Sequence, residues 1–167
     1  MSGIKTRHFY NNLLSFDNIR YLEIGCFIGS TVCSAMYNNN AVVFCIDNWS
    51  EFGNQKEIFL KNFNTYKGNN KAYYIEEDCF KLDVTKLPKF NVYLYDGNHS
   101  KESHYNNLDD IFIYIVDDWN WEEIRIATNN VIKDLNFKIL YEKSIITEKG
   151  EDSLNWWNGI YIVLLQK

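Results

Sequence analysis

The sequence predicts an α/β protein built on a Rossmann-like, doubly wound sheet of seven strands in three α/β/α layers. Apolar segments of strand length alternate with longer polar or amphipathic segments, as expected for strands joined by helices. The strand segments are rich in β-branched residues, which is typical of parallel strands covered on both faces. The connection before the last segment has no helical period long enough to cross back over the sheet, so the sheet is expected to be mostly parallel with its last strand antiparallel.

The elements follow one another regularly along the chain. Residues 1–18 are expected to form a helical extension, and residues 1–167 a single domain with one core. Helices are expected at 29–38, 53–66, 100–110 and 121–135. The seven strands are expected at 20–25, 41–47, 72–76, 91–96, 111–117, 136–146 and 158–166.

The last two strands are joined by the sequence TEKGEDSLNWWNG, which runs from Thr147 to Gly159. It has no helical period long enough to cross back over a sheet. A parallel return needs about a dozen residues or more, and these are usually helical. The last two strands are therefore expected to form a hairpin, which makes the final strand antiparallel to the others.

The composition limits the classes of partner. The chain of 167 residues has a net charge of −5, which argues against a nucleic-acid backbone or an anionic membrane surface as the main partner. No apolar segment reaches the roughly 18 residues of a membrane span, and the first residues lack the apolar core of a signal peptide. The four cysteines form no CxxC pair, so we expect reduced thiols in a cytoplasmic protein.

The first strand and the turn after it carry the clearest functional signal. Gly25 and Gly29 lie where this strand turns into the first helix of the alternating pattern, and Asp47 ends the neighbouring strand. Glycine allows a tight turn and close approach of a ligand, and an acid at that spacing accepts hydrogen bonds from ribose hydroxyls. The stretch therefore predicts an adenosine site at the switch point of the sheet.

The kind of adenosine compound follows from what the turn lacks. The dinucleotide pattern G-x-G-x-x-G and the phosphate-binding pattern G-x-x-x-x-G-K-[ST] are both missing. Glu23 lies just before the turn, so a polyphosphate would be repelled and a sulfonium with an amino group attracted. An oxidoreductase that uses NAD is therefore disfavoured.

Five stretches in order resemble class I S-adenosylmethionine-dependent methyltransferases. LEIGCFIGST is similar to the first motif of that family, VFCIDNW to the second and YYIEEDCF to the third. VYLYDGNHSKESHYNNL resembles the fourth-strand motif of a small bacterial branch with an Asp-Gly-x-His signature, and IYIVDDW resembles the fifth strand of that branch. The resemblance covers roughly residues 19–120 and implies S-adenosylmethionine as the cofactor.

By this resemblance, the first motif supplies residues around the methionyl portion and the ribose of the cofactor. Gly25, Cys26 and Gly29 would face these parts of the cofactor, with Ser30 at the start of the following helix. Glu23 would orient the loop.

The second and third motifs would surround the nucleoside. Asp47 would take the ribose hydroxyls, with Asn48 and Trp49 beside it. Asp78 and Cys79 would border adenine.

A second group of acids ends the fourth and fifth strands. The resemblance places Asp96 near the methionyl amine and the sulfonium, and Asp117 and Asp118 lie on the next strand. Adjacent strands are about 4.8 Å apart, so Mg²⁺ held by Asp96, Asp117 and Asp118 is a candidate that would relieve their repulsion and bind an acceptor hydroxyl. His99 and Asp96 are the candidate catalytic residues. The alternatives are that Asp96 contacts the cofactor only, Asp117 caps a helix, Asp118 is solvated and His99 is a turn residue.

The acceptor is expected to be a small molecule or a glycan methylated on oxygen. If the last strand is reversed, the loop 147–158 brings Trp156 and Trp157 towards the acceptor, and Trp119 and Trp121 follow the fifth strand on the same side. These aromatics could stack on a sugar or an aromatic ring, or they could close the core. A homodimer could complete the acceptor site. A non-catalytic cofactor-binding domain is the alternative function.

Overall fold

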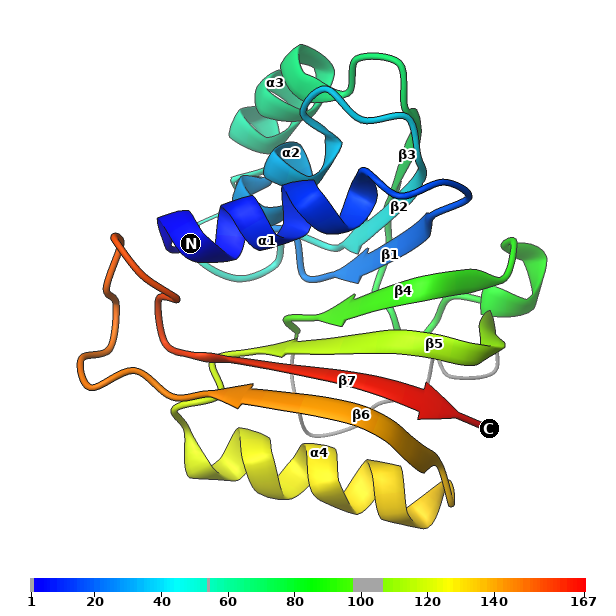
Figure 1. Cartoon of the computed structure of the whole chain (residues 1–167). Helices are drawn as coiled ribbons and strands as arrows, with labels where there is room; N and C mark the ends of the chain where they lie inside the picture. Colours follow the sequence, from blue (N-terminus) through cyan, green and yellow to red (C-terminus); the bar gives the residue numbers. More distant parts are fainter. Residues whose placement is uncertain (1, 54, 98–106) are drawn as a thin grey trace.

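The computed structural model describes residues 2–53, 55–97 and 107–167, and in it one seven-stranded sheet runs through the molecule (Figure 1). The strand order is β3-β2-β1-β4-β5-β7-β6. β7 is antiparallel to both of its neighbours, β5 and β6, whereas the pairs β2–β3, β1–β2, β1–β4 and β4–β5 are parallel. The predicted fold class is therefore confirmed, including the reversed last strand.

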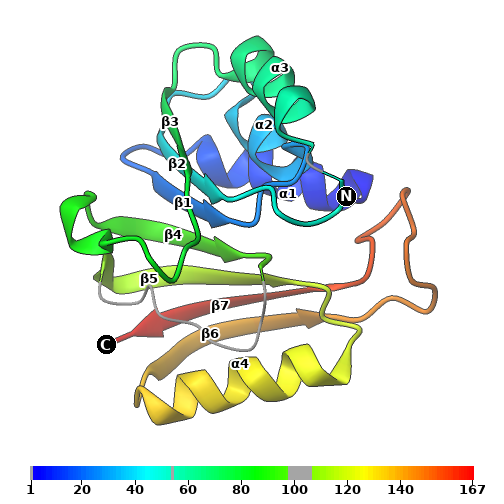
Figure 2. The same ribbon diagram turned by 180° about the vertical axis from the view of Figure 1, so that it is seen from behind.

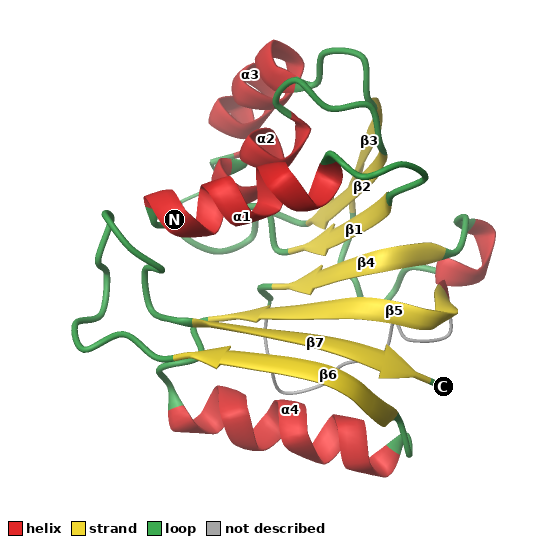
Figure 3. Cartoon of the chain, viewed as in Figure 1, coloured by secondary structure: helices red, strands yellow, loops and turns green. Residues whose placement is uncertain are grey.

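The strands lie close to their predicted positions (Figure 3). Their bounds are β1 Arg20–Ile24, β2 Val42–Asp47, β3 Lys71–Glu76, β4 Phe90–Tyr95, β5 Leu108–Asp117, β6 Lys138–Ile145 and β7 Ile160–Gln166. The helices are α1 Ile4–Leu14, α2 Ser30–Met36, α3 Lys56–Tyr66 and α4 Glu122–Asp134, and a short 3₁₀ helix, η1, spans Val84–Lys86.

The helices form a layer on each face of the sheet. α1, α2 and α3 lie together over β1, β2 and β3, and α4 runs along β6 and β7 (Figures 1 and 2). Tyr21 belongs to the core on the α1–α3 side and Leu22 to the core on the α4 side. Because successive side chains of a strand point to opposite faces, these two cores are separate layers on either side of the sheet.

One predicted boundary is wrong. The helix expected at 100–110 cannot extend to its predicted end, because β5 begins at Leu108 and already includes residues 108–110. Residues 98–106 lie outside the described residues, so the rest of that helix stays a prediction. Pairing between Phe90 and Leu108, with a register shift before Val92, draws the start of β5 into the sheet earlier than its apolar pattern indicated.

The start of α1 is fastened to the loop before β7. The backbone N–H of Ile4 donates to the Ser153 carbonyl at 2.8 Å, and that of Lys5 to the Asn155 carbonyl at 3.1 Å. The first N–H groups of a helix have no partner within the helix, so this loop takes the place of a capping side chain. A Cβ atom at Gly3 would lie 2.0 Å from the Asn155 carbonyl oxygen, so glycine is what allows this close approach.

Candidate functional site

The candidate site lies where β1, β2 and β4 end. The Gly25 N–H donates to the Ile46 carbonyl at 3.0 Å, and the Asp96 N–H donates to the Ile24 carbonyl at 2.9 Å. These two bonds continue the backbone hydrogen bonding of the sheet beyond the ends of the strands. The residues just after β1, β2 and β4 are therefore held side by side. This is the carboxyl edge of an open α/β sheet, where ligands of such folds bind.

Two glycines shape the turn between β1 and α2. Gly25 and Gly29 both have a φ of +84°, which disfavours any residue with a side chain. A Cβ atom at Gly25 would lie 2.1 Å from the carbonyl oxygen of Asp96, so the loop after β1 runs directly against the end of β4. Because Gly25 has no side chain, the backbone of the turn is not covered at the edge of the sheet.

Asp47 fixes the same turn from the end of β2. Its Oδ2 accepts hydrogen bonds from the N–H groups of Cys26 at 2.7 Å and Phe27 at 2.9 Å, and its Oδ1 accepts one from the Trp49 N–H at 2.7 Å. A carboxylate has about four acceptor positions, so three are already occupied by backbone. The predicted role of Asp47 towards ribose stays a prediction, and its structural role is to hold the loop.

Glu23 lies beneath the turn and is fully buried. It accepts hydrogen bonds from the Tyr21 hydroxyl at 2.6 Å and from the Thr31 hydroxyl, which joins β1 to the first turn of α2. Burial raises the pKa of Glu23 to about 7, although the two hydroxyl donors partly oppose this by stabilising the charge. The nearby carboxyls of Asp117 and Asp47 raise the pKa further.

Asp96 and Asp117 bring two more carboxyls to this corner. Burial, followed by the charge of Asp117, raises the pKa of Asp96 well above its ordinary value. Burial and the adjacent Asp118 raise the pKa of Asp117 to about 7. Glu23 also contributes to the raised pKa of Asp96. The corner therefore repels further negative charge and would be stabilised by a cation.

Tyr10 of α1 projects towards these carboxyls from the other side. Its side chain is fully buried, and its hydroxyl has no hydrogen-bond partner among the described residues. Burial and the charges of Asp117, Glu23 and Asp96 all raise its pKa well above the ordinary value of a tyrosine, so the hydroxyl keeps its proton. This hydroxyl is a free donor beside an acidic corner.

The three candidate metal ligands are arranged differently from one another. Asp118 has a φ of +54°, and its Oδ1 accepts a hydrogen bond from Asn158 at 2.9 Å, whereas Asp117 accepts one from the Asp118 N–H at 3.0 Å. Within the described residues, no three Asp, Glu, His or Cys side chains are grouped closely enough to hold a metal ion. His99 lies outside the described residues, so its predicted role stays a prediction. The Mg²⁺ site predicted at Asp96, Asp117 and Asp118 also stays a prediction and gains no support from this arrangement.

Three predicted cofactor residues of the turn have side chains engaged within the protein. Cys26 is buried in the core, so only its backbone faces the edge. The indole of Trp49 is also buried and donates to the Phe27 carbonyl at 2.8 Å, which clamps the loop. The Ser30 hydroxyl is 2.6 Å from the hydroxyl of Ser2.

The other predicted cofactor residues are more open. Asn48 is exposed and accepts hydrogen bonds from the N–H and hydroxyl of Ser50. Asp78 is partly exposed and accepts from the Phe80 N–H at 3.0 Å. Cys79 is partly buried beside it, and burial raises its pKa to about 11, so its thiol stays protonated. Asp78 and Cys79 follow β3 at the same edge of the sheet as Asp47, as a residue pair bordering adenine requires.

The tryptophans divide between core and surface. Trp119 is buried and stacked on Tyr161 with ring centroids 4.2 Å apart, and its indole donates to Ser144. Its role is therefore structural. Trp156 packs against Phe9 of α1 with ring centroids 6.3 Å apart, and Trp121 is about half exposed.

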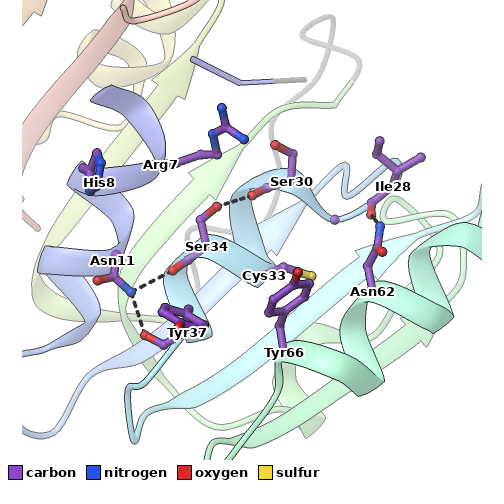
Figure 4. Close-up of a pocket in the computed structure, with 11 residues that line it drawn as sticks. Arg7, His8, Asn11, Ile28, Ser30, Cys33, Ser34, Tyr37, Asn62 and Tyr66 are labelled. Carbon is purple, nitrogen blue, oxygen red and sulfur yellow. Dashed lines mark hydrogen bonds between the residues drawn. The ribbon is translucent and has the colours of Figure 1, made fainter. Parts of the chain in front are cut away.

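A cavity of about 630 Å³ lies away from the carboxyl edge, over α2 and between α1 and α3 (Figure 4). It shares only Ile28, Gly29 and Ser30 with the segment from the turn to the start of α2. The acidic residues predicted to contact the cofactor do not line it. The cavity is therefore a separate feature of the helical face.

Sequence reasoning missed Thr31, Tyr21 and Tyr10. Tyr21 and Glu23 are two residues apart on one strand, so their shared face could have been inferred from the alternation of side chains. Tyr10 gave no such signal, because its approach depends on how α1 packs on the sheet.

Comparison with known proteins shows which solved structures have a similar fold. No protein-family model and no curated protein matches the sequence. Among solved structures, a protein from Klebsiella pneumoniae proposed to be an O-methyltransferase has a TM-score of 0.68 at 11% identity, over 96% of this chain and 80% of that one. The methyltransferase PaMTH1 from Podospora anserina, in its SAH-bound form, has a TM-score of 0.68 at 12% identity, over 97% and 76%.

An rRNA methylase from Streptococcus thermophilus has a TM-score of 0.61 at 11% identity, over 96% of this chain and 93% of that one. At these identities the likeness shows the fold alone, which is the fold of class I S-adenosylmethionine-dependent methyltransferases. In addition, no helix in the described part of the chain has the length and apolar character needed to span a membrane.

Proposed function

We propose that the protein is an S-adenosylmethionine-dependent methyltransferase. The observation that carries the proposal is the acidic corner at the end of β1. There burial and the charge of Asp117 raise the pKa of both Glu23 and Asp96, and Gly25 leaves the backbone of the turn uncovered by a side chain. A sulfonium with an amino group carries the positive charge that such a corner favours. The bare turn leaves room for a ligand to approach the backbone.

The residues fit this cofactor better than they fit a dinucleotide. NAD has a pyrophosphate, which the three carboxyls would repel, and the chain has no glycine-rich helix start to bind one. S-adenosylmethionine supplies a methyl group activated by its sulfonium. The protein's part is to align the acceptor with it, because in-line transfer depends mainly on proximity and orientation.

For the acceptor, we propose a small molecule or a glycan methylated on oxygen. The net charge of −5 disfavours a nucleic acid. Asp96 is the proposed catalytic residue, because it lies at the end of β4 in this corner and burial and the charge of Asp117 raise its pKa well above its ordinary value. His99 is proposed as its partner, and a homodimer as one way of completing the acceptor site.

Titration calorimetry on the Asp47→Ala and Asp47→Asn variants tests the cofactor assignment. Asp47→Ala removes the three hydrogen bonds that the carboxylate accepts from backbone N–H groups, so we expect S-adenosylmethionine affinity to fall about 10- to 100-fold. Asp47→Asn keeps one oxygen for the Cys26 and Phe27 N–H groups and should lose less.

NAD serves as the comparison ligand and should not bind the wild-type protein. Binding of NAD in place of S-adenosylmethionine would contradict the proposal, and so would an unchanged affinity in the Asp47→Ala variant.

The Mg²⁺ proposal has its own test. If Asp118 holds a metal with Asp96 and Asp117, methyl transfer to a catechol or sugar panel should depend on Mg²⁺ and be abolished by chelators and by Asp118→Asn. Methyl transfer that is indifferent to chelators would remove the metal and leave the methyltransferase assignment intact.

A further inference from the structure

The cavity over α2 has the form of a ligand groove. The short α2 helix forms its floor, α1 forms one wall and α3 the other (Figure 4). Its volume of about 630 Å³ lies within the range of roughly 300–1,000 Å³ that is typical of pockets for small ligands. It is independent of the acidic corner, because Asp47, Asp96 and Asp117 are not among its lining residues.

One end of the groove is cationic. Arg7 and His8 of α1 line it, and Arg7 extends towards α2 (Figure 4). Neither side chain makes an ion pair or hydrogen bond with any residue that the structure describes. None of the described residues that line the groove is acidic. A guanidinium with no partner among the described residues, in a groove whose described lining holds no acid, suits a phosphate, which it can bind through two parallel hydrogen bonds.

The other end is aromatic. Tyr37 at the end of α2 and Tyr66 at the end of α3 meet edge to face, with ring centroids 6.3 Å apart. Both side chains are about half exposed, at 55% and 43%. Exposed aromatic faces next to a cavity suit a planar ring, which stacks on them or meets them edge-on.

The middle of the groove is polar but uncharged. The side-chain N–H groups of Asn11 and Asn62 donate to backbone carbonyls at 2.7–2.9 Å, and no described residue donates to their amide oxygens, which are left available as acceptors. Burial raises the pKa of Cys33 on the floor to about 12, so its thiol is neutral. The groove therefore offers a cation at one end, acceptors in the middle and rings at the other end.

From this order of groups, the geometry points to a second binding site for a small monophosphate ester that carries a planar ring, such as a nucleoside monophosphate. The phosphate contacts Arg7 and His8, hydroxyls of the ligand donate to Asn11 and Asn62, and the ring lies against Tyr37 and Tyr66. This site shares Gly29 and Ser30 with the predicted cofactor residues but none of the carboxyls of the acidic corner, and it goes beyond the proposed function. A cofactor with a positive sulfonium has no matching charge in this groove.

The test is calorimetry with uridine 5′-monophosphate, phenyl phosphate, uridine and inorganic phosphate. The first two probes contain both parts that the groove recognises, and none contains adenine. We expect uridine 5′-monophosphate to bind with a Kd of about 0.1–1 mM, and uridine or inorganic phosphate alone to bind more weakly. Binding should persist with S-adenosylhomocysteine present, and it should weaken with added salt.

Two variants separate the ends of the groove. Arg7→Gln should lower the affinity for uridine 5′-monophosphate and for inorganic phosphate about 10-fold or more. Tyr66→Leu should lower the affinity for the ring-bearing probes only. Lys5→Gln and Tyr141→Leu, an exposed lysine on α1 and an exposed tyrosine on β6 that do not line the groove, are the matched controls and should change neither.

The proposal is overturned if neither ester binds at about 5 mM, if S-adenosylhomocysteine displaces the esters, or if Arg7→Gln leaves their affinity unchanged. Affinity for S-adenosylmethionine is measured on the same samples. Failure of the cofactor assignment therefore shows in that titration alone and does not affect the result for the groove.

Discussion

The two halves of the sheet build the same edge in different ways. In the half formed by β1, β2 and β3, the edge is set by the backbone of the turn after β1, because Gly25 runs against the end of β4 and the Asp47 carboxylate accepts hydrogen bonds from two N–H groups of that turn. In the half formed by β5, β7 and β6, the edge is set by side chains of two asparagines. Asn120 bonds Thr147, and Asn158 bonds Asp118 and Glu151.

The difference explains which half can be recognised from sequence. A backbone constraint requires one particular residue, such as glycine at a positive φ, and so leaves a motif. A network of side chains can be built in many ways and leaves none. The predicted cofactor residues accordingly cluster in the first half, and the acceptor stays undefined in the second.

Gly25→Ala should have the largest effect on stability. The new methyl group would meet the Asp96 carbonyl and occupy a residue with a φ of +84°, so we expect a loss of about 3 kcal/mol or more in the free energy of unfolding. Gly68→Ala is the matched control, because Gly68 also has a positive φ but its nearest atom is 3.9 Å away, and it should cost about 1 kcal/mol. Urea unfolding of both variants measures the difference. Equal losses would show that the turn is not fixed by contact with β4.

The pH dependence of stability should be the next largest effect. The pKa of Glu23 is about 7 in the folded chain against an ordinary value of 4.5, so the folded chain binds this proton more tightly than the unfolded chain. The free energy of unfolding therefore falls as the pH rises from 4.5 to 7, by up to about 3 kcal/mol from this group, and levels off above pH 7.

Urea unfolding across that pH range, on the wild type and on Glu23→Gln and Asp117→Asn, shows how much of the pH dependence comes from each half of the sheet. Glu23 lies on β1 and Asp117 on β5. Each variant removes one buried carboxyl and should flatten the curve. A Glu23→Gln curve as steep as that of the wild type would contradict the raised pKa of Glu23.

Asn158→Ala should have the smallest effect of the three. It removes the hydrogen bonds to Asp118 and from the Glu151 N–H, and we expect a loss of about 1–2 kcal/mol with cofactor affinity unchanged. Asn130→Ala, at an exposed position of α4, is the control and should change stability by less than about 0.5 kcal/mol. A large fall in cofactor affinity in Asn158→Ala would show that the two halves are not independent.

Much of the fold could be predicted because it depends on local patterns. The seven strands and the reversed last strand follow from apolar periodicity and from the lack of a helical period in the connection that begins at Thr147. The start of β5 at Leu108 could not be predicted, because its first residues join the sheet through pairing with Phe90, and this contact is not visible in the local pattern.

The site was predictable in position but not in its contacts. Gly25, Glu23 and Asp47 fall at one edge as expected, because strand ends of a parallel sheet meet there. The sequence could not show that the Asp47 carboxylate is occupied by backbone N–H groups, or that the ring of Trp119 is stacked on Tyr161 inside the core. Both depend on packing between segments far apart in the chain.

The joint between α1 and the loop before β7 has a consequence for synthesis of the chain. Ile4 and Lys5 leave the ribosome well before Ser153 and Asn155, whose carbonyls receive their N–H groups. The first turn of α1 must wait for about 150 further residues, which take roughly 10–30 s at typical rates of translation. Until then Tyr10 has no finished sheet to cover, so this domain closes only after the loop before β7 has been synthesised.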